Sequence, residues 1–194
     1  MVMLELIKKI RNQTGAGVID VKKALDEANG DEKEAIELLR KRGLEKANKK
    51  GGREACEGII ASYVHTNKKV AVIVQLLCET DFVAMNEEFL ALGEDVAMHI
   101  AAMNPKSVSP DQVPEDIIEE HKKMWAEELK EEKKPKEIIE KIMLGKEQKL
   151  RGENALLSQA FVKDPDRTVE EMIKEKAGKM GENIKVGEFT RMEL

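Results

Sequence analysis

The sequence predicts an α+β protein in which helices are more abundant than strands. Charged residues make up 37% of the chain and aromatic residues only 3%, which indicates much solvated helix surface around an aliphatic core. Apolar residues recur at helical spacing in residues 1–43, whereas residues 58–64 and 70–77 are continuous β-rich runs. We therefore expect a helical N-terminal unit, followed by a small antiparallel sheet packed with helices.

Residues 1–43 show three short helical stripes separated by turn residues. Glycines at 15 and 17 separate the first two helices, Asn29 and Gly30 end the second, and Gly43 is expected to stop the third. Asp31 and Glu34 resemble a capping box at the start of the third helix. The narrow stripes predict that the three helices pack on one another, through Met3, Ile7 and Ile10; Val21, Ala24, Leu25 and Ala28; and Ala35, Ile36, Leu38 and Leu39.

Residues 44–55 are predicted to form a basic linker. Paired glycines amid like charges resist a fixed backbone, which is typical of a hinge. The basic run 41–53 could contact phosphate, but no aromatic residue is interleaved for base stacking, and the formal net charge of the chain is −5. A solvated linker is favoured, and RNA binding remains an alternative.

Residues 56–194 are expected to form the core domain. Its sheet would comprise a hairpin over 56–78, which turns at 65–69, and a closing strand over 184–192. Asn86 can cap a helix that ends at Asn104 and Pro105 and has Phe89, Leu92, Val96, Ile100 and Met103 on its apolar face. Residues 80–83 therefore lie in the turn between a strand and a helix.

A helical hairpin is predicted over 115–150, from two charged helices (115–134 and 136–150) broken at Pro135. The hairpin would bury an apolar seam of Ile117, Ile118, Met124, Trp125 and Leu129 against Ile138, Ile139, Ile142 and Met143. Thr168 and Glu171 form a second capping-box pattern, which begins a helix expected to stop at Gly181.

The motifs of a reaction centre are missing from the sequence. It has no phosphate-binding GxxxxGK[ST] loop and no dinucleotide, zinc-protease or EF-hand pattern, so we expect no catalytic residue, cofactor or metal. Cys56 and Cys78 suggest free thiols, and His99 is expected to be packed or solvated. No run reaches membrane-spanning length, and charge appears too early for a signal peptide, which predicts a cytoplasmic location.

Thr80, Asp81, Phe82 and Val83 stand out because an acid and an aromatic adjoin at a turn in a chain with only four phenylalanines. In a structural interpretation, Asp81 caps backbone N–H groups and Phe82 covers the core. In a functional interpretation, Phe82 fills a pocket of a partner protein and Asp81 delivers a charge beside it. The residues alone leave both interpretations open.

Six ordered segments of this chain closely resemble the bacterial elongation factor Ts family, which exchanges guanine nucleotides on elongation factor Tu. These segments are IRNQTGAGVIDVKKALDEANGD (10–31), CETDFVAMN (78–86), VAMHIAAMNP (96–105), KPKEIIEKI (134–142), LLSQAFVKD (156–164) and GENIKVGEF (181–189). The resemblance implies a ubiquitin-associated-like N-terminal domain and the short form of the family, with one core repeat. Short forms are expected to form homodimers. Thr190 stands where some members have a linking cysteine, which implies a non-covalent dimer.

The resemblance also implies roles for particular residues. Asp81 and Phe82, with Thr80 and Val83, match the segment that enters the GTPase domain and disturbs its Mg²⁺ and phosphate loop. A second, N-terminal patch that grips the same domain is matched by Arg11, Gly17, Val18 and Ile19. Met85 and Leu77 depart from the usual family residues beside the tip. Two alternatives remain open, a ubiquitin-associated-like interaction adaptor and an RNA-binding accessory protein.

Overall fold

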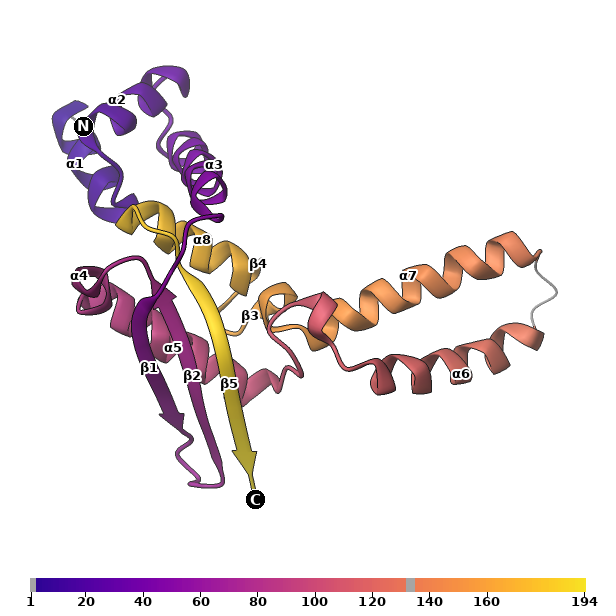
Figure 1. The fold of residues 1–194 in the computed structure, drawn as a ribbon. Coiled ribbons are helices and arrows are strands. Elements are labelled where there is room, and N and C mark those ends of the chain that lie inside the picture. The colour runs from indigo at the N-terminus through magenta and orange to yellow at the C-terminus, as the bar shows by residue number, and fades with distance from the viewer. Residues whose placement is uncertain (1–2, 132–134) are drawn as a thin grey trace. The chain divides into compact units, whose positions relative to one another are not determined.

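The computed structural model of the chain describes residues 3–131 and 135–194. The fold is α+β, as predicted (Figure 1). The chain forms two compact units, each assembled from separate stretches of sequence. The first unit comprises Met1–Ile59, Leu76–Leu92 and Glu171–Lys185, and the second comprises Ile60–Gln75, Gly93–Glu170 and Val186–Leu194.

The helices are α1 (Met3–Thr14), α2 (Val18–Glu27), α3 (Glu32–Lys50), α4 (Asp81–Ala84), α5 (Glu87–Met103), α6 (Glu115–Glu131), α7 (Lys136–Asn154) and α8 (Val169–Met180), with short 3-10 turns η1 (Pro110–Gln112) and η2 (Leu156–Ser158). The strands are β1 (Glu57–Val64), β2 (Val70–Cys78), β3 (Ala160–Phe161), β4 (Asp164–Thr168) and β5 (Lys185–Glu193).

The predicted packing of α1, α2 and α3 is confirmed, but the contribution expected of Met3 is wrong, because its side chain is 48% exposed. The buried residues of their cluster are Ile10, Val21, Ala24, Leu25, Ala28, Ala35 and Leu39. The turn before α3 has the expected geometry, since Asn29 and Gly30 have φ of 50° and 85°. The Asp31 carboxylate accepts a 2.9 Å hydrogen bond from the backbone N–H of Glu34 and so caps α3.

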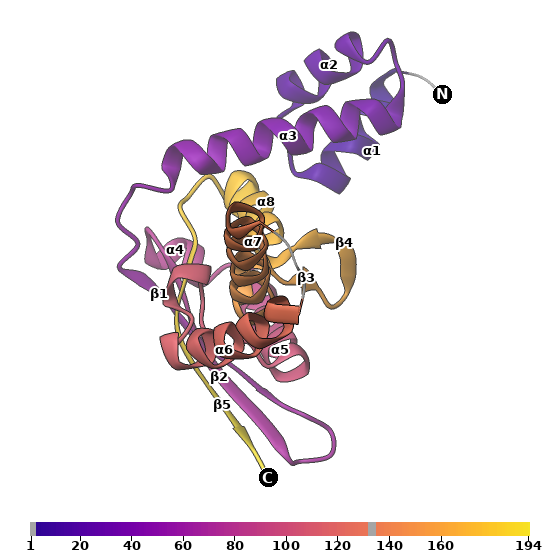
Figure 2. The same ribbon diagram turned by 90° about the vertical axis from the view of Figure 1, so that its right-hand side faces the viewer.

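The predicted end of the third helix at Gly43 is wrong, because α3 continues to Lys50 (Figure 2). Gly43 does not adopt the positive φ of a glycine that ends a helix, and Gly178 of α8 packs closely against its backbone. A Cβ atom on Gly178 would lie 2.8 Å from the carbonyl oxygen of Gly43. Seven residues of the predicted linker 44–55 are therefore helical, while the division of the chain at 1–43, 44–55 and 56–194 stays a prediction.

The predicted hairpin and closing strand are confirmed as an antiparallel sheet with the order β1-β2-β5 (Figure 1). The His65 N–H donates to the Val70 carbonyl at 2.9 Å and closes the hairpin turn. One face of β2 is buried, through Val70, Val72, Val74, Leu76 and Cys78. On β5, the Arg191 guanidinium donates to the Ala101 carbonyl of α5 at 3.2 Å.

The small sheet of β3 and β4 was not predicted. Its strands pair antiparallel, with Ala160 opposite Thr168 and Phe161 opposite Asp164. His99 is buried beside this sheet, so the packed environment and not the solvated one is present. Its Nδ1 accepts the Val162 N–H at 3.2 Å, so the proton is on Nε2, which donates to Gln159 at 3.0 Å. Burial lowers the pKa of His99, which favours this neutral form.

The predicted helical hairpin is present as α6 and α7, which lie side by side (Figure 1). Ile118 and Leu129 are buried, but Met124 and Ile138 are 47% and 46% exposed, so the expected apolar seam is only partly closed. The predicted end of the first helix at residue 134 lies outside the described residues. Within 3–131 and 135–194, no helix is long and apolar enough to cross a membrane.

Replacing glycine with alanine should have opposite effects on stability at positions 43 and 178, which contact each other. Gly178→Ala should destabilise the protein by about 1–2 kcal/mol, because its methyl group would meet the backbone of α3. Gly43→Ala should stabilise it by roughly 0.5–1 kcal/mol, because a Cβ there meets nothing within 4 Å and alanine favours a helix. Thermal unfolding of both variants checks the pair. A lower midpoint for Gly43→Ala would contradict the continuous helix.

Candidate functional site

The predicted site residues Thr80–Val83 form a short projecting turn, here called the tip, between β2 and α5. Thr80 is the N-cap of α4, and its Oγ1 accepts the Val83 N–H at 3.4 Å. The Met85 N–H donates to the Asp81 carbonyl at 3.0 Å and completes the single helical turn. The tip therefore has a defined backbone, although α4 has only four residues.

The side chains of the tip do not fit the structural interpretation of this segment. Phe82 is 84% exposed, so it does not cover the core, and Phe89 in α5 is the fully buried aromatic of this region. Thr80, not Asp81, supplies the cap. In the part of the chain that the structure describes, the Asp81 carboxylate has no hydrogen bond or ion pair. The structural interpretation is therefore wrong for both residues.

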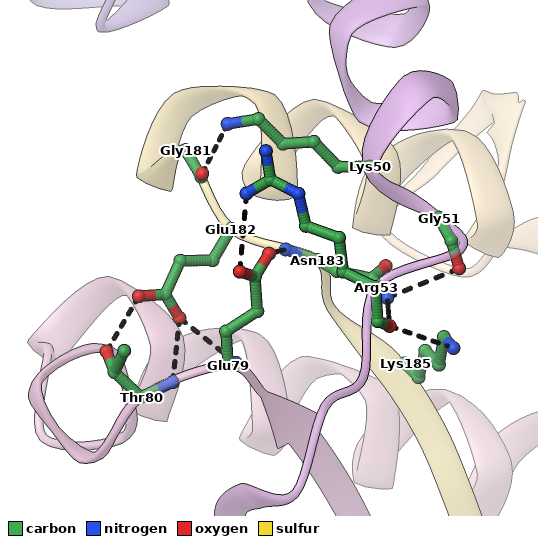
Figure 3. A network of polar contacts seen from close by, with 9 residues as sticks. All are labelled: Lys50, Gly51, Arg53, Glu79, Thr80, Gly181, Glu182, Asn183 and Lys185. Atoms are coloured by element: carbon green, nitrogen blue, oxygen red, sulfur yellow. Dashed lines mark hydrogen bonds and ion pairs between the residues drawn. The ribbon is translucent and has the colours of Figure 1, made fainter.

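The Glu182 carboxylate holds the start of the tip with three hydrogen bonds (Figure 3). Its Oε2 accepts the backbone N–H groups of Glu79 and Thr80, both at 3.1 Å. Its Oε1 accepts the Thr80 hydroxyl at 2.6 Å. Glu182 follows Gly181, whose φ of 80° ends α8 and turns the chain toward the tip.

Glu79 forms the reciprocal connection (Figure 3). Its carboxylate accepts the Asn183 backbone N–H at 2.7 Å and pairs with Arg53 at 3.3 Å. The Asn183 N–H, followed by Arg53, holds the pKa of Glu79 below its usual value. The Asn183 side chain donates in turn to the carbonyls of Arg53, at 2.7 Å, and Gly51, at 3.3 Å. The end of α3 is thereby joined to the same network.

The far side of the tip is also anchored on α8. The Asn86 side chain accepts the Glu88 N–H at 2.8 Å and starts α5, as predicted. The Glu88 carboxylate forms ion pairs with Lys179 and, at 3.4 Å, with Lys176. These lysines lower the pKa of Glu88, with Lys179 as the larger cause. Both flanks of the tip are thus fixed to one helix and its C-terminal end.

Cys78 precedes the tip and has no features of a nucleophile. It is fully buried, and its thiol donates to the Thr80 carbonyl at 3.1 Å. Burial, together with the nearby Glu182, raises the pKa of the thiol and keeps it protonated. Cys56 is a free, exposed thiol. Among the described residues, no three His, Cys, Asp or Glu side chains gather as metal ligands.

The second predicted set forms an exposed surface at the junction of α1 and α2. Arg11 lies in the last turn of α1, and Gly17 is the N-cap of α2. Val18 and Ile19 follow it and are 51% and 72% exposed, which is unusual for two adjacent branched aliphatic residues. We call Arg11, Gly17, Val18 and Ile19 the N-terminal patch. It belongs to the same compact unit as the tip.

The sequence alone did not reveal the residues that hold the tip. In a chain that is 37% charged, Glu79 and Glu182 have the appearance of solvated surface residues. The backbone N–H groups that connect their two segments lie more than a hundred residues from the carboxylates that accept them, so no local spacing connects them. The one available signal was Gly181, which marks the helix end directly before Glu182.

Comparisons with known proteins agree along nearly the whole chain. A family model described as Elongation factor TS matches residues 4–194. Elongation factor Ts of Thermosipho melanesiensis is 54% identical and covers 98% of this chain and 97% of its own length. The proteins of the same name from Fervidobacterium nodosum and Solidesulfovibrio magneticus are 50% and 47% identical. The match to the Fervidobacterium protein covers 98% of this chain and 96% of the relative, and the match to the Solidesulfovibrio protein covers 97% of this chain and 94% of the relative.

The lowered pKa of Glu79 predicts a dependence of stability on pH. Because its folded-state pKa is depressed, the carboxylate stabilises the fold at neutral pH, and this contribution is lost as the pH falls through the folded-state pKa. Glu79→Gln should therefore flatten the decrease in unfolding free energy between neutral pH and about pH 3. Urea unfolding across that range measures the effect, with the exposed Glu94→Gln as control. Parallel curves for wild type and Glu79→Gln would contradict the assignment.

Proposed function

Since the chain belongs to the elongation factor Ts family, we propose that it is the exchange factor that releases GDP from elongation factor Tu. Membership supports a role in translation elongation, as a nucleotide-exchange factor and not a classical enzyme. The observation that carries the proposal is Phe82, an aromatic that is 84% exposed at the end of a firmly anchored turn. Cytoplasmic location is part of the proposal, because translation takes place there.

In this proposal, the tip acts on the GTPase domain of the partner through shape and charge. Phe82 inserts into an apolar pocket, where burying an exposed aromatic ring provides binding free energy. Asp81, whose carboxylate is exposed, then lies close to the Mg²⁺ and the phosphate loop. Losing Mg²⁺ removes positive charge beside the phosphates, and a displaced loop stops donating N–H groups to them, so GDP dissociates faster.

The cycle is completed by thermodynamic linkage. A factor that weakens nucleotide binding to the GTPase must be weakened equally by the nucleotide. GTP rebinding therefore releases the factor. A coupling of about 3 kcal/mol corresponds to roughly a hundredfold change in affinity, at about 1.4 kcal/mol per tenfold. The factor itself needs neither a nucleotide nor a metal.

The N-terminal patch is proposed to bind the same GTPase domain. Val18 and Ile19 supply apolar contact area, and Arg11 can donate to acceptors of the partner at its edge. The absence of a side chain at Gly17 lets another surface approach closely, since nothing lies within 4 Å of the position that its Cβ would take. An adaptor function of the three helices would also use this patch, but it would leave the anchored tip without a role.

The RNA-binding alternative is weakened by the contacts of the basic run 41–53. Arg42 pairs with Glu27 at 2.5 Å, and Lys46 pairs with Asp20 at 2.9 Å. Lys50 donates to the Gly181 carbonyl, and Arg53 pairs with Glu79. These four cations are therefore engaged within the chain, where they stabilise the first unit.

A non-covalent homodimer is also part of the proposal, supported by one face of the sheet. Ile60, Val64 and Ile73 lie on neighbouring strands and are 65%, 54% and 52% exposed. Exposed apolar residues gathered on one sheet face favour pairing with a second copy. Thr190 lies in β5, so no disulfide can form at that position. Two factors would then bind two GTPases.

The tip proposal predicts that catalytic amounts of the protein accelerate release of a fluorescent GDP analogue from the cognate elongation factor Tu. Phe82→Ala should reduce this acceleration by about tenfold or more, because the ring is the apolar anchor. Stopped-flow fluorescence measures both rates. Thermal unfolding should hardly change, since the ring is outside the core.

Met103→Ala is a matched control for that experiment, because it also truncates an exposed apolar side chain but lies at the end of α5. It should leave exchange near the wild-type rate. An unstimulated release rate with the wild-type protein would overturn the proposed function. Equal rates for Phe82→Ala and wild type would overturn the role of the ring.

The dimer proposal predicts a mass of twice 21.8 kDa in sedimentation equilibrium at micromolar concentration. Ile73→Lys should shift the mass toward the monomer, because burying an unpaired charge in an apolar interface is costly. Ile138→Lys introduces the same change at a similarly exposed isoleucine of α7 and should leave the mass unchanged. A monomeric wild-type protein would contradict the dimer.

A further inference from the structure

The tip needs support from outside itself. A single helical turn of four residues is unstable in isolation, because its two helical hydrogen bonds, from the N–H groups of Ala84 and Met85, do not offset the loss of backbone entropy. Ala84 is the only buried residue of α4, and Phe82 contributes nothing to packing at 84% exposure. The structure of the tip must therefore be imposed by the segments at its two ends.

The geometry of Glu182 fixes the direction of the cap hydroxyl. A carboxylate only accepts, so the single hydroxyl proton of Thr80 points to Glu182 Oε1 at 2.6 Å. This leaves a lone pair of the same oxygen free for the Val83 N–H at 3.4 Å. Without a pure acceptor in this position, the hydroxyl could rotate, and the N-cap of α4 would be lost for part of the time.

The other oxygen of Glu182 fixes the backbone that leads into the tip. It accepts the consecutive N–H groups of Glu79 and Thr80, where β2 has ended and no strand partner is available. Hydrogen bonds to a charged acceptor are roughly twice as strong as neutral ones. The reciprocal bond from the Asn183 N–H to Glu79, at 2.7 Å, prevents the two segments from sliding past each other.

We propose that Glu182 is a positioning residue for nucleotide exchange, which acts through Thr80 to hold α4 in the shape that the partner binds. This proposal rests on the proposed function. Glu182 is half-buried and bonded to the chain, so it does not serve as a contact itself. Because the turn is already formed in the free protein, binding does not include the entropy loss of ordering it.

Hydrogen–deuterium exchange of the free protein tests the positioning directly and needs no partner. In Glu182→Ala, the amides of residues 79–84 should exchange at least tenfold faster than in wild type, while the amides of α1, α2 and α3 keep their protection. Glu182→Gln retains one acceptor oxygen and should lie between the two. Glu94→Gln, an exposed glutamate of α5, should match wild type.

Exchange kinetics separate positioning from loss of folded protein. A loosened tip should raise the concentration of GTPase·GDP that gives half-maximal rate by about tenfold and leave the maximal rate within about twofold, because the bound state is unchanged. Partial unfolding would instead lower the maximal rate per total protein and leave the half-saturating concentration unaltered. If Glu182→Ala proves too unstable, Glu182→Gln supports the same comparison, with about a threefold increase expected.

The outcomes distinguish this proposal from the proposed function. Unchanged amide exchange at residues 79–84 in both Glu182 variants would overturn the positioning role, whatever the protein does to a GTPase. Faster amide exchange with wild-type exchange kinetics would also overturn it. A wild-type protein that fails to release GDP would overturn the proposed function, and with it the kinetic part of this inference.

Discussion

The crossed hydrogen bonds of Glu79 and Glu182 are the interaction on which the tip depends. Each carboxylate accepts backbone N–H groups from the other's segment, so the end of β2 and the end of α8 are joined in both directions. Asn183 extends the connection to residues 51 and 53, beyond α3. Three segments that are far apart in the sequence meet here, and the tip begins at this point.

This arrangement explains how a short turn can serve as a binding element. In α4, Asp81 and Phe82 are exposed and do not pack against the rest of the unit. Their side chains are therefore free to contact a partner. The tip is stabilised by residues on either side of it. Glu182 accepts charge-assisted hydrogen bonds from the backbone before the tip, and Glu88, after the tip, forms ion pairs with α8. The basic run 41–53 serves the same unit, since Arg42, Lys46 and Arg53 pair with acids of the chain itself.

The sequence predicted the features that depend on local spacing and failed where distant contacts decide. Apolar periodicity identified the three N-terminal helices, and continuous β-rich runs identified the two strands of the hairpin. Local spacing could not show that α3 passes Gly43, nor that the backbone of Gly43 contacts Gly178 of α8. The two-residue strand β3 is too short to have a period. For the tip, the exposure of Phe82 excludes the structural interpretation, which the residues alone had slightly favoured.

A structure of this protein bound to nucleotide-free elongation factor Tu would test directly whether the tip is preformed for binding. We expect α4 to enter the GTPase domain with Phe82 buried. Residues 79–84 should keep the backbone they have in the free chain, including the three hydrogen bonds to Glu182. A complex in which the tip is solvent-exposed, or in which it refolds and releases Glu182, would show that this turn is not preformed for binding.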